Sequence, residues 1–123
     1  DLARWAFELY DEMAGLGLKP NNYILSSLLA ACAREGRGLP RAKRSVQEFV
    51  EQGGRPNNAT WTSLISLCAA CREPDEALLI AREHCERPLD PYIRSAICSA
   101  IASTGRADLA PHASRWQSEA AAA

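Results

Sequence analysis

Residues 6–21 read AFELYDEMAGLGLKPN and contain an amphipathic helix, its stop signal and the start of another helix. The apolar residues recur at i, i+3, i+4 and i+7, the spacing of one helix face: Ala6, Leu9, Tyr10 and Met13. Gly15 and Gly17 then weaken the helix, and Pro20 closes it. Asn21 is a good N-cap for a following helix. The stretch therefore predicts two consecutive helices joined by a short turn.

A similar stretch recurs 36 residues later, where residues 42–57 read AKRSVQEFVEQGGRPN. The alignment places five pairs of residues in register: Ala6 with Ala42, Met13 with Phe49, Gly17 with Gly53, Pro20 with Pro56, and Asn21 with Asn57. A period of this size, with two helices in each unit, indicates an α-solenoid. Each helix pair has an incomplete core and buries its apolar face against the next pair.

The whole chain reads as one all-α repeat array. Residues 1–21 are the second half of a repeat, 22–57 and 58–90 are full repeats, and 91–123 are a degenerate repeat. We expect seven helices, with boundaries near residues 15–22, 36–40, 53–58, 72–74, 87–91 and 105–107. The apolar stripes place these residues between consecutive units: Leu28, Cys32, Leu64, Cys68, Ile97 and Ile101.

Composition is that of a globular protein. The 123 residues are 47% hydrophobic and 24% charged, with a formal net charge of −1. Such a charge gives no general attraction to polyanions, and no apolar run approaches the roughly 20 residues of a membrane span. The first residues already lie inside a predicted helix, so we interpret the sequence as part of a longer chain.

The five cysteines have no framework spacing. Cys68 and Cys71 form a C-x-x-C within a predicted helix, with His84 and Cys85 about one hairpin away. A zinc site needs four converging ligands, and the stripe position of Cys68 favours core thiols instead.

The sequence also shows no nucleophile–base pair and no phosphate-cradling glycine loop. We therefore predict a protein that is not an enzyme, with no metal, cofactor or small-molecule substrate.

The phrases AFELYDEMAGLGLKPN and NNYILSSLLAACAREG resemble pentatricopeptide repeats. Tetratricopeptide repeats are the nearest alternative, but their Trp/Leu-Gly/Tyr pattern is absent from the first helices. The resemblance implies a right-handed α-solenoid that works on RNA in a mitochondrion or plastid. Members of the family stack one unpaired base per repeat along the first helices and read it with two or three side chains.

The resemblance also implies which side chains read bases. It pairs Ser26 with Asn57 in the first full unit and Thr62 with Asp90 in the second. A hydroxyl with an amide suits adenine, and a hydroxyl with a carboxylate suits the N–H donors of guanine. The implied preference is 5′-AG-3′. In the third unit, Ser95 corresponds to Ser26 and Thr62.

Three further residues complete the implied recognition set. Asn21 ends the first half-repeat, and Tyr23 and Tyr92 stand where family members place the side chains that sandwich bases. Ala59 in the same place departs from that pattern. Capping explains part of the set without RNA, because Asn and Asp before a helix and Ser and Thr near its start are common.

Basic residues concentrate in one short segment: Arg34, Arg37, Arg41, Lys43 and Arg44. Such a run is usually a solvated face, and the alternative is a set of phosphate contacts. Arg34 fits a place where the family often has Lys or Arg, but Ala70 and Ser103 occupy the corresponding places.

Two functions follow. The first is sequence-selective binding of single-stranded RNA or rRNA in organellar RNA processing, stability or translation. The second is a non-catalytic scaffold that binds other proteins of an organellar ribosome or ribonucleoprotein. The Ser/Asn and Thr/Asp pairs favour the first, and the nearly neutral first-helix face favours the second. An enzyme with its catalytic domain elsewhere ranks third.

Overall fold

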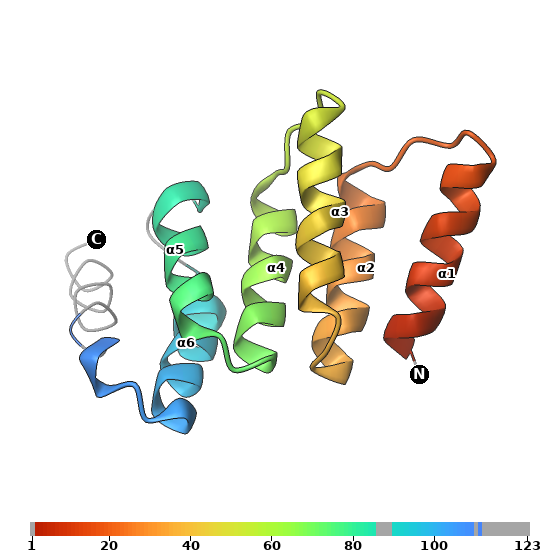
Figure 1. Ribbon diagram of the computed structural model, residues 1–123. Coiled ribbons are helices and arrows are strands. Elements are labelled where there is room, and N and C mark those ends of the chain that lie inside the picture. The colour runs from red at the N-terminus through yellow and green to blue at the C-terminus, as the bar shows by residue number, and fades with distance from the viewer. Residues whose placement is uncertain (1, 86–89, 110, 112–123) are drawn as a thin grey trace.

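The computed structural model describes residues 2–85, 90–109 and 111, which are all-helical (Figure 1). Six α-helices follow one another: α1 (Leu2–Gly15), α2 (Asn22–Glu35), α3 (Leu39–Glu51), α4 (Asn58–Ala70), α5 (Pro74–His84) and α6 (Pro91–Thr104). A 3-10 turn, Ala107–Leu109, comes after α6. The predicted all-α repeat fold is confirmed. The seventh predicted helix, from about Ala107, lies mostly outside the described residues.

The helices form two layers. In Figure 1, α3 lies in front of α2 and α5 lies in front of α6. In the rear layer, α4 packs against α2 on one side and α6 on the other, while it also contacts α5. The first helices of successive units, α2, α4 and α6, therefore make one continuous surface, with α1, α3 and α5 as the second-helix layer.

Local sequence signals set the helix starts. The side-chain oxygens of Asn21, Asn57 and Asp90 accept hydrogen bonds from the first free N–H groups of α2, α4 and α6. Pro74 and Pro91 each occupy the first position of a helix, where the missing N–H costs nothing. The helix ends lie where the glycine, proline and asparagine signals predict them.

One helix end departs from the glycine rule. Gly36 and Gly105 terminate α2 and α6 in the left-handed conformation, with φ of 65° and 68°. Arg72 stands at the corresponding place after α4 and adopts φ 60°, which strains a residue with a Cβ. The chain nevertheless closes there in the same way, because the Glu73 N–H donates to the Cys68 carbonyl at 2.9 Å.

The predicted inter-unit core is confirmed. All six residues are buried: Leu28 4%, Cys32 0%, Leu64 3%, Cys68 0%, Ile97 0% and Ile101 6% exposed. Ala42 and Ala77, the small residues that recur in the second helices, are both fully buried. Close approach of neighbouring helices thus depends on alanine at this place. Within the described part of the chain, no helix is both long and apolar enough to cross a membrane.

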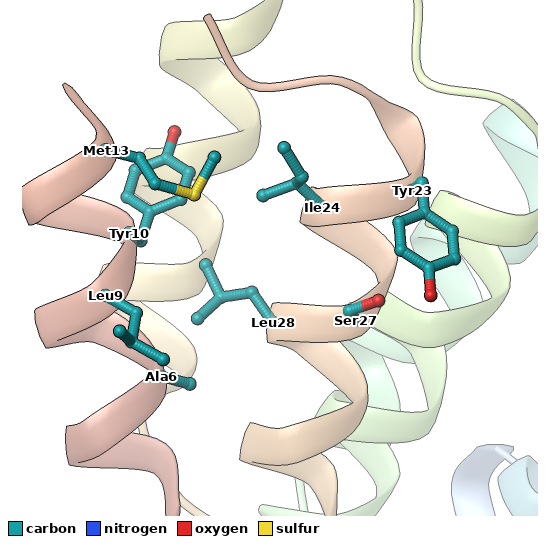
Figure 2. Close-up of a pocket in the computed structure, with 8 residues that line it drawn as sticks. All are labelled: Ala6, Leu9, Tyr10, Met13, Tyr23, Ile24, Ser27 and Leu28. Carbon is teal, nitrogen blue, oxygen red and sulfur yellow. The ribbon is translucent and has the colours of Figure 1, made fainter. Parts of the chain in front are cut away.

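An apolar groove runs between α1 and α2 (Figure 2). Leu9 and Met13 line it from α1, and Ile24 and Leu28 line it from α2. Leu9 is 47% exposed, whereas its counterpart one unit later, Ser45, is 5% exposed and lies in the core. Among the described helices none covers this groove.

Candidate nucleic-acid interface

The first-helix layer carries a shallow hollow of about 360 Å³. Seven residues line it: Ala30, Ala33 and Arg34 from α2, Ser63, Ser66 and Ala70 from α4, and Tyr92 from α6. Five of them are alanine or serine, so the surface is open and nearly uncharged. Arg34 supplies a cation at one part of the lining and Tyr92 supplies an aromatic ring at another. This combination suits a nucleotide, whose base stacks on a ring and whose phosphate pairs with a cation.

The two tyrosines expected to sandwich bases are both exposed. Tyr23 is 80% exposed near the start of α2, and Tyr92 is 68% exposed at the same place in α6. Large aromatic rings on a surface are available for stacking, and stacking tolerates any base because every base has a π-face. The aromatic surface of Tyr92 therefore belongs to the hollow, together with Arg34.

Asn57 lies in a network of hydrogen bonds between two successive units. Its Oδ1 accepts from the Thr60 N–H at 3.0 Å, which caps α4. Its own backbone N–H donates to Oδ1 of Asn22 at 2.8 Å. The buried hydroxyl of Thr60 also donates to Asn22 Oδ1, again at 2.8 Å. Asn22 is the first residue of α2, so the residue that ends the unit is tied to the helix that begins it.

Ser26 lies one helical turn after Asn22, on the same side of α2. Its hydroxyl donates to the Tyr23 carbonyl at 3.1 Å, which leaves the oxygen free to accept from a ligand. Asn57 reaches this end of α2 through Asn22. Ser26 and Asn57 therefore both lie near the start of α2, and their pairing on one base stays a prediction.

The second implied pair is less constrained. Asp90 is exposed, and its Oδ1 accepts from the Tyr92 N–H at 2.7 Å. That bond leaves the second carboxylate oxygen as an acceptor. Thr62 is half-buried on α4, and Ser95 is exposed on α6. Asn21, which ends the first half-unit, caps α2 through a 2.8 Å bond from the Ile24 N–H.

The five basic residues are spread over two helices and the turn between them. Arg34 is on α2 and lines the hollow, while Arg41, Lys43 and Arg44 are on α3 in the other layer. Arg37 lies in the turn between α2 and α3. The chain reverses direction between Glu35 and Leu39, so Arg34 and the three α3 residues belong to different layers. A phosphate role for the five residues stays a prediction.

Two of the α3 cations hold neighbouring helices together. Arg41 pairs with Asp11 of α1, and its guanidinium lies 4.6 Å from the centre of the Phe7 ring. Lys43 pairs with Glu76 of α5 at 2.8 Å, and this hydrogen bond raises the pKa of the lysine. These contacts link α1, α3 and α5 in the second-helix layer. Arg34 is the one of the five basic residues that lines the hollow.

The C-x-x-C thiols belong to the packing of α4. Cys68 is fully buried and Cys71 is half-buried. Burial raises the pKa of Cys68 to about 12 and that of Cys32 to about 11, so both are protonated at neutral pH. Among the described residues, no group of three or more His, Cys, Asp and Glu is placed to hold a metal ion. His84 instead stacks on Trp61, with ring centres 4.0 Å apart.

These thiols predict a loss of stability at alkaline pH. A thiol whose pKa is higher in the folded state contributes stability that is complete below the unfolded pKa of 9.0 and is lost towards the folded pKa. We expect the free energy of unfolding to fall between pH 9 and pH 11, by up to about 1.4 kcal/mol per thiol and pH unit, and Tm to fall with it. Calorimetry on Cys68→Ala should show a shallower fall than the wild type. Identical falls would mean that Cys68 does not titrate on unfolding in this range.

Sequence comparisons give a consistent set of relatives. The family model for the pentacotripeptide-repeat region of PRORP matches residues 1–113. The mitochondrial 15S rRNA processing factor ppr3 of Schizosaccharomyces japonicus is 30% identical over 92 residues, 73% of this chain. Two pentatricopeptide repeat-containing proteins of Arabidopsis thaliana, At1g04840 and At4g21065, are 33% and 36% identical over 61% and 58% of it. The chain spans 13%, 11% and 12% of the lengths of these three relatives.

Proposed function

The chain belongs to the pentatricopeptide repeat family, and on that premise we propose that its α2–α4–α6 surface binds single-stranded RNA. The protein acts in RNA processing, stability or translation in a mitochondrion or plastid, and the chain itself supplies binding, not catalysis. One relative is a mitochondrial rRNA processing factor by name, which supports this role and this compartment. RNA or rRNA is the primary partner, with other proteins of the same ribonucleoprotein beside it.

The observation that carries the proposal is the hollow that Arg34 and Tyr92 both line. Both residues were assigned to RNA contact from sequence, one to phosphate and the other to a base. They come from different units, yet they line one depression whose other walls are small side chains. A nucleotide needs such a juxtaposition of a cation, a ring and open space.

Base selectivity is proposed for the two polar pairs. The cap bond to Thr60 uses the oxygen end of the Asn57 amide, so the amino group is left to donate to adenine N1. The cap bond to Tyr92 uses one oxygen of Asp90, so the other is left to accept from guanine N–H groups. With Ser26 and Thr62 as the hydroxyl partners, the preference is 5′-AG-3′.

A scaffold that binds protein is the second candidate function. One observation favours it: α4 carries no charged residue. An uncharged surface gives RNA few phosphate contacts. The two functions differ in how strongly RNA retention depends on salt.

Arg34→Ala is expected to weaken RNA binding and to flatten its salt dependence. Loss of one phosphate contact on a single strand lowers the slope of log K against log[salt] by about 0.7. Filter binding of single-stranded RNA by the full-length protein across a salt series measures this slope. Arg44→Ala is the matched control, because Arg44 is an exposed arginine on α3 in the opposite layer. Equal slopes for Arg34→Ala and Arg44→Ala would contradict the assignment and favour the scaffold.

A further inference from the structure

Asn22 makes three side-chain contacts across the boundary between two units. Its Oδ1 accepts from the Asn57 backbone N–H and from the Thr60 hydroxyl, both at 2.8 Å. Its Nδ2 donates to the Arg55 carbonyl at 3.1 Å. Asn22 thus holds the turn before α4 on one side and the first turn of α4 on the other. Of the residues in this network, only Asn57 is among those proposed to read a base.

The network also fixes which end of the Asn57 amide is turned inward. Thr60 is fully buried, its N–H donates to Asn57 Oδ1 at 3.0 Å, and its Oγ1 lies 3.2 Å from the same oxygen. Asn22 positions Thr60 by accepting its hydroxyl hydrogen and positions Asn57 by accepting its backbone hydrogen. Both groups that define the orientation of the Asn57 side chain are therefore anchored to one residue.

The next unit lacks the hydroxyl contact of this clamp. Asn58 corresponds to Asn22, but the counterpart of Thr60 is Ile93, which has no hydroxyl. At Asp90 the orientation of the cap matters less, because both ends of a carboxylate are acceptors. An amide has one donor end and one acceptor end, so a reversed Asn57 would present the wrong group to a base. The clamp occurs at the place where orientation decides selectivity.

We propose that Asn22 is a positioning residue for base recognition: it holds Asn57 with the amino group outward and so makes residues 22–57 select a base that offers a ring-nitrogen acceptor. The inference rests on the proposed RNA binding. Adenine fits, since N1 accepts from Asn57 and N6 donates to the Ser26 oxygen. Guanine carries a hydrogen on N1 and is rejected by the same amino group.

The test is selection of a randomised single-stranded RNA pool by the full-length protein, followed by sequencing of the retained RNA. The wild type is expected to enrich adjacent A and G. Asn22→Ala is expected to lower the A-to-G ratio at the first of these positions by roughly 3- to 10-fold, the equivalent of one hydrogen bond. The second position, read by Thr62 and Asp90, is the internal reference and keeps its G.

Two further variants separate positioning from folding. Asn22→Asp keeps the acceptor for Asn57 and Thr60 and is expected to retain the A preference. Asn58→Ala makes the same truncation one unit later and is expected to leave A enrichment unchanged.

Equal A enrichment in the wild type and Asn22→Ala would overturn the positioning role while RNA reading stands. A wild type that enriches no base step would overturn both. A loss of A and G together in Asn22→Ala would show a general structural role and also overturn positioning.

Discussion

Leu64→Ala is expected to lower the free energy of unfolding by about 2–5 kcal/mol. Leu64 is 3% exposed on α4, the helix that contacts α2, α5 and α6. Removal of its side chain forfeits apolar burial and leaves a cavity in the core, and the rigid neighbours refill it only in part. Chemical denaturation followed by circular dichroism measures the change.

Leu79→Ala is the matched control. Leu79 is also a helical leucine, on α5, but it is 49% exposed. Surface substitutions of this kind usually change stability by less than about 0.5 kcal/mol. Comparable losses in the two variants would show that α4 does not form the centre of the stack.

Helix ends were predictable because their causes are local. Asn21, Asn57 and Asp90 cap the helices that follow them within three residues, and glycine or proline marks the ends. The core was predictable for a related reason. A stripe at helical spacing must face a neighbour, and a repeat of this period fixes the neighbour as the next unit, which places Leu28, Leu64 and Ile97 in equivalent contacts.

Contacts between units were not predictable, because they depend on how far one helix is offset from the next. The Asn22–Thr60 hydrogen bond joins residues 38 positions apart, and the sequence around neither residue predicts it. The same holds for the Arg41–Asp11 pair. The Trp61–His84 stack, which lies within one unit, also depends on how two helices are placed against each other. The three-residue turn between α2 and α3 likewise places Arg34 and Arg41 in different layers.

The caps explain why recognition and folding share residues. A helix N-terminus needs one acceptor for its free N–H groups, and each of Asn57 and Asp90 supplies it with a single oxygen. The other end of the side chain remains for a ligand, and its chemistry differs: an amino group in Asn57 and a second oxygen in Asp90. A change between Asn and Asp therefore alters the group offered to a base without removing the cap.

Asp90→Asn is accordingly expected to move the base preference of residues 58–90 from G towards A, with little change in stability. Asn caps a helix about as well as Asp, whereas the outward group changes from an acceptor to a donor. A well-placed base-edge contact is worth about 1–3 kcal/mol in the related DNA setting, so the ratio of G to A should shift by roughly 5- to 150-fold. Binding of RNAs that differ at this one nucleotide, measured with the full-length protein, gives the ratio.

Two substitutions make this measurement decisive. Asn57→Asp is the reciprocal change one unit earlier and is expected to move the neighbouring preference from A towards G. Glu12→Gln removes one carboxylate from the exposed surface of α1 and controls for net charge alone. If G preference persists in Asp90→Asn, or if Glu12→Gln reproduces the shift, then Asp90 is a cap and Thr62 a surface residue. In that case the uncharged α4 surface argues for the protein-binding scaffold instead.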